Sequence, residues 1–197
     1  MVSLHKVLRY LFVSKVRIKC LKYFFLNQDV PIHLRGMARE LNEEINAVRR
    51  ELMRLDEIKL LKSTKRGNKK YFSLNFDFPY FEEFCSLFIK SDGLGEDIIK
   101  KHNKLGAIYF AALTSAFVSG VNINHKEIDL IIIGDIDLEL LGEIVRKEEE
   151  KIGREINYTV LKLAEFNLRK KRKDPFITNL LLSTKVLLIG NREEYVS

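Results

Sequence analysis

The first third of the chain contains apolar residues that recur every three or four positions. This spacing runs through residues 14–26, 32–41 and 43–58, and it predicts three amphipathic helices. Turn-forming residues, among them Pro31, separate the first two segments. We expect Asn42 to be the N-cap of the third helix, because its short side chain can accept a hydrogen bond from a free backbone N–H.

Two short runs with strand character follow the third helix, at residues 59–63 and 70–74. The turn between them, residues 64–68, contains Gly67, which can adopt a positive φ at little steric cost. Three helices followed by a hairpin form the plan of a winged helix-turn-helix. We therefore predict a winged helix-turn-helix domain over residues 1–76.

The hydrophobic pattern changes after residues 77–104, an aromatic-rich stretch that we expect to form a helical connector. Beyond it, short apolar runs alternate with amphipathic segments of helix length, as in a sheet covered by helices. The run IDLIII is apolar apart from Asp129, and its nearly continuous apolar character predicts a strand buried on both faces. The expected strands are 107–112, 128–133, 156–161 and 186–189, and the expected helices are 80–90, 96–104, 137–152, 164–172 and 174–182. The predicted fold class is a two-domain α+β or α/β chain, whose second domain, residues 105–197, holds a mixed sheet with flanking helices.

Charge is distributed unevenly along the chain. Residues 1–75 hold 17 Lys and Arg and 7 Asp and Glu, whereas residues 76–197 hold 17 Lys and Arg and 20 Asp and Glu. The net charge of +10 in the first part predicts a polyanion partner, which we expect to be double-stranded DNA. The residues expected to read base edges from the third helix are Asn46, Arg49 and Arg50, and those expected to hold phosphates from the hairpin are Lys65, Arg66, Lys69 and Lys70. RNA is a weaker alternative, for which Tyr71 and Phe72 would have to stack on bases.

The rest of the composition narrows the class of protein. No apolar run approaches the roughly 20 residues that span a bilayer, and the first residues lack the pattern of a signal peptide. We expect a cytoplasmic protein with no membrane partner. Cys20 and Cys85 fall in apolar helical patterns, which predicts two buried thiols in a reducing compartment. The four histidines show no zinc-ligand spacing.

Two acids at the entrance of the apolar run IDLIII carry the strongest hint of chemistry. Glu127 and Asp129 are two residues apart, so in a strand their side chains point to the same face. Two carboxylates on one face can hold Mg²⁺ for phosphoryl or nucleotidyl transfer.

Five stretches of the chain, taken in order, carry a resemblance to a known architecture. They are LFVSKVRIKCLKYFFLN, INAVRRELMRLDEIKLLKSTKRGNKKYFSLN, EIDLIIIGDIDLELL, GREINYTVLKLAEF and DPFITNLLLSTKVLLIGN. Over nearly the whole chain they resemble the family of prokaryotic winged-helix regulators fused to a minimal nucleotidyltransferase-like domain. The resemblance implies a strand, a Gly-Ser turn and a helix that hold a triphosphate, followed by two acids that bind Mg²⁺.

The same resemblance exposes departures at the catalytic positions. An ungapped match puts Ser115 at the glycine and Ala116, which has no hydroxyl, at the serine. Pairing Thr114 and Ser115 with the motif instead requires an insertion and still lacks glycine. The first acid is Glu127 in place of Asp, and the stretch INYTVL, where a third acid is expected, contains none, although Glu155 stands just before it. The degenerate nucleotide turn would comprise Ser115, Ala116 and Gly120, and a basic residue common there would fall on Ser119.

These observations lead to one functional hypothesis and one rival. The hypothesis is a DNA-binding transcriptional regulator whose C-terminal domain is catalytically inactive and serves dimerisation or ligand sensing. It implies a homodimer, an optional nucleotide effector, no catalytic residue and no cofactor, with Glu127 and Asp129 as a vestigial metal pair. The rival is an active, Mg²⁺-dependent minimal nucleotidyltransferase of the toxin–antitoxin type that carries a DNA-binding domain.

Overall fold

The computed structural model describes residue 8, residues 11–119 and residues 127–196. Contacts divide the chain into two compact units, Val2–Phe88 and Ile89–Ser197. The division falls within the stretch predicted as a connector, residues 77–104. Each unit is described by itself.

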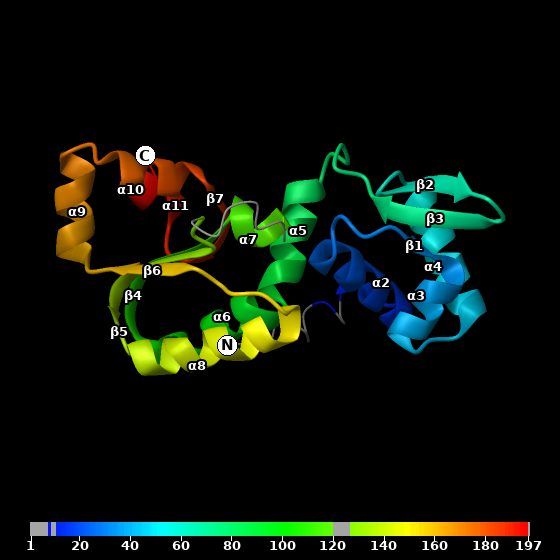
Figure 1. Ribbon diagram of the computed structural model, residues 1–197, viewed down its shortest axis with the longest axis horizontal. Coiled ribbons are helices and arrows are strands. Elements are labelled where there is room, and N and C mark those ends of the chain that lie inside the picture. Colours follow the sequence, from blue (N-terminus) through cyan, green and yellow to red (C-terminus); the bar gives the residue numbers. More distant parts are fainter. Residues whose placement is uncertain (1–7, 9–10, 120–126, 197) are drawn as a thin grey trace. The chain divides into compact units, whose positions relative to one another are not determined.

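The N-terminal unit contains the three predicted helices, α2 (Lys15–Leu26), α3 (Leu34–Leu41) and α4 (Ile45–Glu57) (Figure 1). Ser14 begins α2 by accepting a hydrogen bond from the backbone N–H of Arg17. The apolar stripe of each helix faces a common core, as its spacing predicts. The buried residues of this core include Phe24, Phe25, Met37, Val48, Leu52, Leu55 and Phe72.

A three-stranded antiparallel sheet completes this unit. Its strands are β1 (Ile32–His33), β2 (Leu61–Arg66) and β3 (Lys69–Leu74), in the order β1–β3–β2. Arg66 pairs with Lys69 across the turn, so the turn is two residues long. Three helices, a short strand between the first two and a terminal hairpin are the parts of a winged helix, in which β2 and β3 form the wing.

Three local predictions in this unit were wrong. The second helix does not begin at residue 32, because residues 32–33 form β1. Asn42 does not cap α4: it has a φ of 49° and ends α3, its N–H bonding back to Arg39 and Ala38. Glu44 caps α4 instead. The turn predicted over residues 64–68 is shorter, because cross-strand hydrogen bonds extend both strands to the glycine.

The predicted helix in the aromatic stretch is α5 (Phe81–Lys90). Its rings pack on α2 within the N-terminal unit, where Phe25 stacks on Phe88 at a centroid distance of 5.4 Å and on Phe84 at 6.0 Å. Such aromatic pairs stabilise the fold beyond the contribution from burying their apolar surface. Cys20 and Cys85 are both buried, as predicted.

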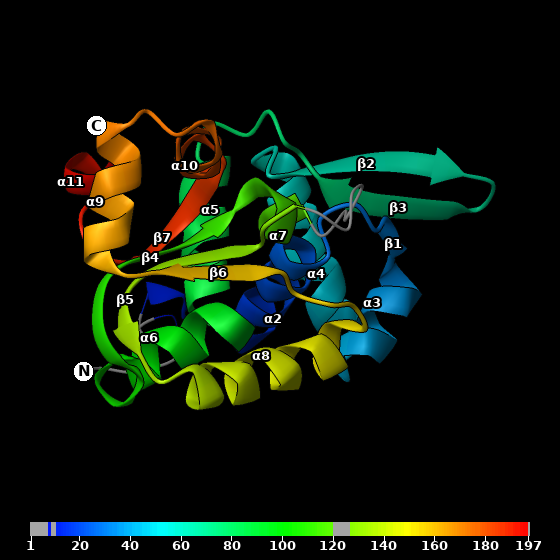
Figure 2. The same ribbon diagram turned by 60° about the vertical axis from the view of Figure 1, so that its left-hand side comes forward.

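The C-terminal unit is a four-stranded mixed sheet with helices on both faces (Figures 1 and 2). The strand order is β6–β5–β4–β7, in which β5 and β6 are parallel and the other pairs antiparallel. The strands are β4 (Gly106–Thr114), β5 (Leu130–Ile136), β6 (Tyr158–Leu161) and β7 (Thr184–Ile189). The helices are α6 (Gly93–Leu105), α7 (Ser115–Ser119), α8 (Leu138–Ile152), α9 (Leu163–Lys171), α10 (Pro175–Leu182) and α11 (Arg192–Val196).

Side chains alternate between the two faces of this sheet. Phe110 and Ile131 belong to a core cluster with residues of α9 and α10, such as Phe166 and Ile177, and the ring of Tyr195 in α11 packs against it. Helices α6 and α8 lie on the opposite face (Figure 2). The prediction that IDLIII is buried on both faces is confirmed for residues 130–133, which are fully buried.

The pattern of apolar positions predicted neither α7 nor α11 in this unit, although α7 follows β4 where the resemblance implies a helix. The predicted strand 107–112 is buried only in its second half: Tyr109 is 45% exposed, whereas Phe110, Ala111 and Ala112 are fully buried. Strand β7 pairs with β4 from Ala111 onward, so the first residues of β4 lack a neighbour on that side among the described strands.

Candidate nucleic-acid interface and candidate metal site

The exposed face of α4 carries the three residues predicted to read bases, Asn46, Arg49 and Arg50. Arg49 donates from Nη1 to Oδ1 of Asn46 at 3.2 Å, which links two of them. Arg50 makes no ion pair shorter than 4.0 Å with an acid in the part of the chain that the structure describes. This face therefore presents two guanidinium groups to solvent.

A carboxylate stands at the first turn of the same helix. Glu44 accepts hydrogen bonds from the backbone N–H groups of Asn46 and Ala47, both at 2.7 Å. The hydrogen bond from Asn46, followed by that from Ala47 and the charge of Arg50, holds the pKa of Glu44 below its ordinary value. The start of α4 is consequently negative, and the cations lie one turn further along the helix.

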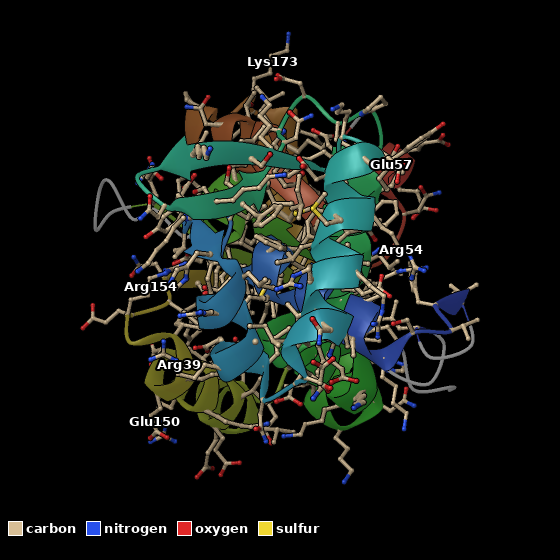
Figure 3. All side chains as sticks on the ribbon, turned by 90° about the vertical axis from the view of Figure 1, so that its right-hand side faces the viewer. Arg39, Arg54, Glu57, Glu150, Arg154 and Lys173 are labelled. Carbon is tan, nitrogen blue, oxygen red and sulfur yellow. The ribbon has the colours of Figure 1, made fainter. Side chains whose placement is uncertain are left out.

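Arg54, near the end of α4, belongs to a different cluster. It pairs with Glu51 at 3.1 Å, and Arg17 of α2 donates to the other oxygen of Glu51 at 2.8 Å. Burial would raise the pKa of Glu51, but the bonds from Arg17 and Ser14 and the charges of Arg17 and Arg54 lower it overall. Figure 3 shows Arg54 on the side of α4 turned away from α3. Glu51 thus ties α2 to α4 through Arg17, and Arg54 adds a second cation to this cluster from within α4.

The wing holds the four predicted phosphate contacts, and all four are exposed. Lys70 pairs with Asp56 at 2.8 Å and lies 5.1 Å from the ring of Phe72, so its charge is partly used within the fold. Arg66 lies over the ring of Tyr71 at 5.4 Å. Lys65 and Lys69 make no ion pair with any acid that the structure describes.

The rings proposed for RNA stacking are occupied. Phe72 is only 4% exposed and belongs to the core. Tyr71 stacks on His33 at a centroid distance of 5.4 Å, with Arg66 on it as well. A base would have to displace these partners, so the wing offers little surface for stacking.

A hollow of about 530 Å³ lies between α3, α4 and the wing. Its walls combine apolar side chains with four cations, so it can take up an apolar body and an anion together. The lining residues are His33, Leu34, Arg35, Arg49, Leu52, Met53, Asn68, Lys69, Lys70 and Phe72.

The candidate metal site is built around a buried carboxylate with a protein cation as its partner. Arg154 donates from Nη2 to Oδ1 of Asp129 at 3.0 Å and from Nη1 to Oδ2 at 3.1 Å. The backbone N–H of Asn157 donates to Oδ2 at 2.9 Å. The side chain of Asp129 is 1% exposed and that of Arg154 is 19% exposed. The guanidinium also lies 5.7 Å from the ring of Phe117 in α7.

The remaining predicted site residues do not converge on this carboxylate as ligands. Glu127 and Glu155 are exposed, and the carbonyl of Glu155 accepts a hydrogen bond from Arg154. The described residues contain no group of three or more His, Cys, Asp or Glu that could hold a metal ion. Sequence reasoning missed Arg154, because a lone arginine 25 positions after its partner carries no pattern.

The predicted nucleotide turn follows β4, as expected for its place in the chain. Ser115 and Ala116 begin α7, where Ala116 is buried and the N–H of Ser115 donates to the carbonyl of Ser183 at 2.8 Å. Thr114 is buried, and its hydroxyl donates to the carbonyl of Ile128, which leaves it unavailable to a phosphate. Gly120 lies outside the described residues.

Comparison with known proteins gives no family. No family model matches the chain, and no curated protein matches it. Parts of the chain are similar to the transcriptional regulator Tm0710 from Thermotoga maritima, at 18% identity and a TM-score of 0.38 over 52% of this chain and 68% of that one. They are also similar to MepR, a transcription regulator of the Staphylococcus aureus multidrug efflux pump MepA, at 18% identity and a TM-score of 0.36 over 51% of this chain and 82% of that one. A third similarity is to reduced HlyU from Vibrio cholerae, at 15% identity and a TM-score of 0.34 over 43% of this chain and 84% of that one. At these values the similarities do not bear on function. None of the described helices has the length and apolar character needed to cross a membrane.

Proposed function

We propose that this chain is a DNA-binding transcriptional regulator that contacts double-stranded DNA through α4 and the wing of its N-terminal unit. The observation that supports this most directly is a set of exposed cations on α4 and the wing. Arg49, Arg50, Lys65 and Lys69 are exposed and make no ion pair with an acid among the described residues, and two of them, Arg49 and Lys69, line the hollow. A one-sided excess of charge on these elements is the footprint of a nucleic-acid-binding surface.

In this proposal, α4 enters the major groove and the wing follows the adjacent backbone. Arg49 and Arg50 would read guanine edges bidentately, and Asn46 would read adenine. The hollow would seat one sugar–phosphate strand, with sugars against Leu34 and Met53 and phosphates against Lys69. Glu44 would repel a phosphate at the very start of α4, which favours a pose in which the second turn of the helix lies closest to the bases.

The C-terminal unit is, in this proposal, nucleotidyltransferase-like but catalytically inactive. The order β4–α7–β5, with Asp129 at the entrance of β5, is the order that the resemblance implies for a nucleotidyltransferase. The guanidinium of Arg154 already satisfies Asp129, and Ala116 supplies no hydroxyl for a phosphate. The unit would serve as the dimerisation body of a homodimer or as the site of an effector, because half-site spacing follows from a dimer.

The DNA proposal can be tested with the full-length protein and a pool of randomised duplexes. Selection should enrich one sequence, and fluorescence anisotropy should then show a loss of about 1–3 kcal/mol in specific binding for Arg50→Ala. Lys65→Gln and Lys69→Gln should each reduce the slope of log K against log salt by about 0.9. Arg39→Ala, an exposed arginine of α3 that does not line the hollow, is the matched control. Failure to enrich any sequence, with no slope change in the wing variants, would refute the proposal.

The inactivity of the C-terminal unit has its own test. Calorimetric titration of the full-length protein with ATP and with GTP, with and without Mg²⁺, should give no Mg²⁺-dependent heat. Heat that requires Mg²⁺ and disappears in Asp129→Ala would establish a functioning metal site and favour the active nucleotidyltransferase instead.

A further inference from the structure

We propose that the C-terminal unit carries a second contact for the DNA backbone, formed by Lys171, Arg172 and Lys173 at the end of α9. These residues close the run RKKRK, residues 169–173, the longest stretch of consecutive cations in the chain. Residues 156–197 hold eight basic and four acidic residues, whereas residues 89–155 hold nine basic and thirteen acidic ones. The positive charge of this unit is thus concentrated around α9.

The first two cations of the run are used inside the fold. Arg169 pairs with Glu165 one turn earlier at 2.6 Å. Lys170 donates from Nζ to the carbonyl of Tyr195 at 3.2 Å. The next three residues are exposed, and none makes an ion pair with an acid in the described parts of the chain. The fold therefore leaves three adjacent charges facing solvent, where they repel one another.

The turn that presents these charges is fixed by backbone hydrogen bonds. The N–H of Asp174 donates to the carbonyl of Arg169, and that of Lys173 to the carbonyl of Lys170, both at 3.0 Å. This pattern is a Schellman motif, whose left-handed position is most often glycine. Here Lys173 occupies that position with a φ of 52°. A side chain at positive φ costs free energy that glycine would not, and backbone strain of this kind clusters at functional sites.

A cation at the end of a helix also interacts favourably with the carbonyls of the last turn, which is the structural explanation for such residues. That explanation accounts for one or two cations within the last turn. It does not account for Lys173, which lies beyond the helix and whose left-handed backbone favours glycine. Figure 3 shows the side chain of Lys173 extending outward into solvent.

DNA is the polyanion that fits this arrangement best. Duplex DNA carries one negative charge per about 1.7 Å of its axis, so three neighbouring cations on a fixed turn can each meet a phosphate. The N-terminal unit, with its net charge of +10 over residues 1–75, calls for the same class of partner. An anionic membrane surface is the competing class, and the test below separates the two.

The test uses the full-length protein and a fluorescent duplex of about 30 base pairs between 50 and 200 mM salt. The triple variant Lys171→Gln, Arg172→Gln, Lys173→Gln should lower the magnitude of the salt slope by about 2–3 and weaken binding about tenfold or more. A control triple variant, Lys101→Gln, Lys104→Gln, Arg146→Gln, removes the same charge from α6 and α8 and should change affinity by no more than about twofold, because salt screens distant charges. Equal losses in both triple variants, or no loss in the first, would overturn the proposal.

Single substitutions at Lys173 separate a binding role from a structural one. Lys173→Gly should raise the urea midpoint of unfolding, because glycine relieves the positive φ, and should weaken DNA binding by roughly threefold to tenfold. Lys173→Arg should retain DNA affinity. A Lys173→Gly variant that gains stability and binds DNA as tightly as the wild type would contradict the proposal.

Two further measurements distinguish DNA from a membrane surface as the partner, and the contact at residues 171–173 from the contact at the wing. Vesicles containing phosphatidylserine should bind the wild type and the triple variant equally; a loss of vesicle binding with unchanged DNA affinity would replace DNA by a membrane surface. A Lys65→Gln, Lys69→Gln variant reports on the wing. If it binds DNA normally while the variant at residues 171–173 does not, the wing contact of the proposed function fails and the contact at residues 171–173 stands.

Discussion

The pair formed by Arg154 and Asp129 offers a quantitative test of how the C-terminal unit is held together. Replacing Arg154 by Met removes two hydrogen bonds, of 3.0 and 3.1 Å, from a carboxylate that is 1% exposed. One backbone donor, the N–H of Asn157, remains. Breaking a buried ion pair from one side costs about 3–5 kcal/mol, because the other charge stays buried and unpaired. Since Arg154 is 19% exposed, we expect a loss near the lower limit, about 3 kcal/mol.

A double-mutant cycle isolates the interaction from the loss of packing. Asp129→Asn keeps an acceptor for the N–H of Asn157 but removes the charge. The double variant Asp129→Asn, Arg154→Met should therefore lie within about 1–2 kcal/mol of the wild type, because no charge is left unpaired. The coupling free energy should fall in the range of about 1–3 kcal/mol.

The assay must report on this unit separately, because a chain with two units need not unfold in one step. The chain has no tryptophan, so unfolding in urea is followed by far-ultraviolet circular dichroism. Hydrogen exchange of peptides covering β5 and β6 then localises the loss. Two results would refute the assignment of Arg154 as the partner that balances Asp129. One is a loss of unfolding free energy below about 1 kcal/mol in Arg154→Met. The other is a double variant whose loss equals the sum of the losses in the two single variants.

Mg²⁺ extends the same experiment. If the acids retain metal affinity once the guanidinium is gone, Mg²⁺ at ten times its dissociation constant would restore about 1.4 kcal/mol to Arg154→Met. We expect no such rescue, because Glu127 is exposed and one buried carboxylate is a poor magnesium site.

Four further outcomes follow from individual side chains. Burial outweighs the attraction of Lys151 and raises the pKa of Glu148, so the protonated carboxyl group is favoured in the folded state; its contribution to stability is complete below about pH 4.5 and is lost as pH rises through the raised pKa. Glu148→Gln should therefore be more stable than the wild type at pH 7 and lose that advantage at low pH, as read from urea midpoints. Burial, together with Glu51 and Glu43, raises the pKa of Cys20 to about 12, so this thiol should react with a thiol reagent at pH 8 only after urea unfolds the protein. Glu44→Gln should tighten DNA binding in anisotropy titrations, because it removes the charge at the start of α4. Lys59→Gly should raise the midpoint of thermal unfolding, with a gain of about 1 kcal/mol, because Lys59 has a φ of 63°.

The fold was largely predictable from the spacing of apolar residues, because each helix or strand buries one face and the residues of that face recur at a fixed interval along the sequence. On α4 the stripe of Val48, Leu52 and Leu55 is at most 3% exposed, and the same rule found nearly every longer helix and strand. The errors lie where one residue type serves two roles. Asn42 could begin one helix or end another, and a left-handed backbone that ends α3 took precedence over capping α4.

The candidate sites were predictable to different degrees. Helical and strand periodicity predicts which cations of α4 and the wing are exposed, and the exposure of Arg49 and Lys69 is confirmed; their role in binding stays a prediction. The partner of Asp129 was not, because Arg154 meets it through the parallel pairing of β5 and β6, and that pairing brings together residues 25 positions apart. Contacts of this kind depend on tertiary structure and leave no local pattern.

The charges around Asp129 explain why the residues here are unsuited to the magnesium site that the resemblance implies. A magnesium ion brings two positive charges to a pair of carboxylates and gives up much of its hydration to bind them. Here one buried carboxylate, Asp129, meets one guanidinium, so the charge of the pair is already balanced. A metal would have to displace Arg154 and desolvate it, with the exposed Glu127 as its second ligand. Changing Glu127 to Asp would therefore not create a magnesium site by itself, because Arg154 would still balance the charge of Asp129.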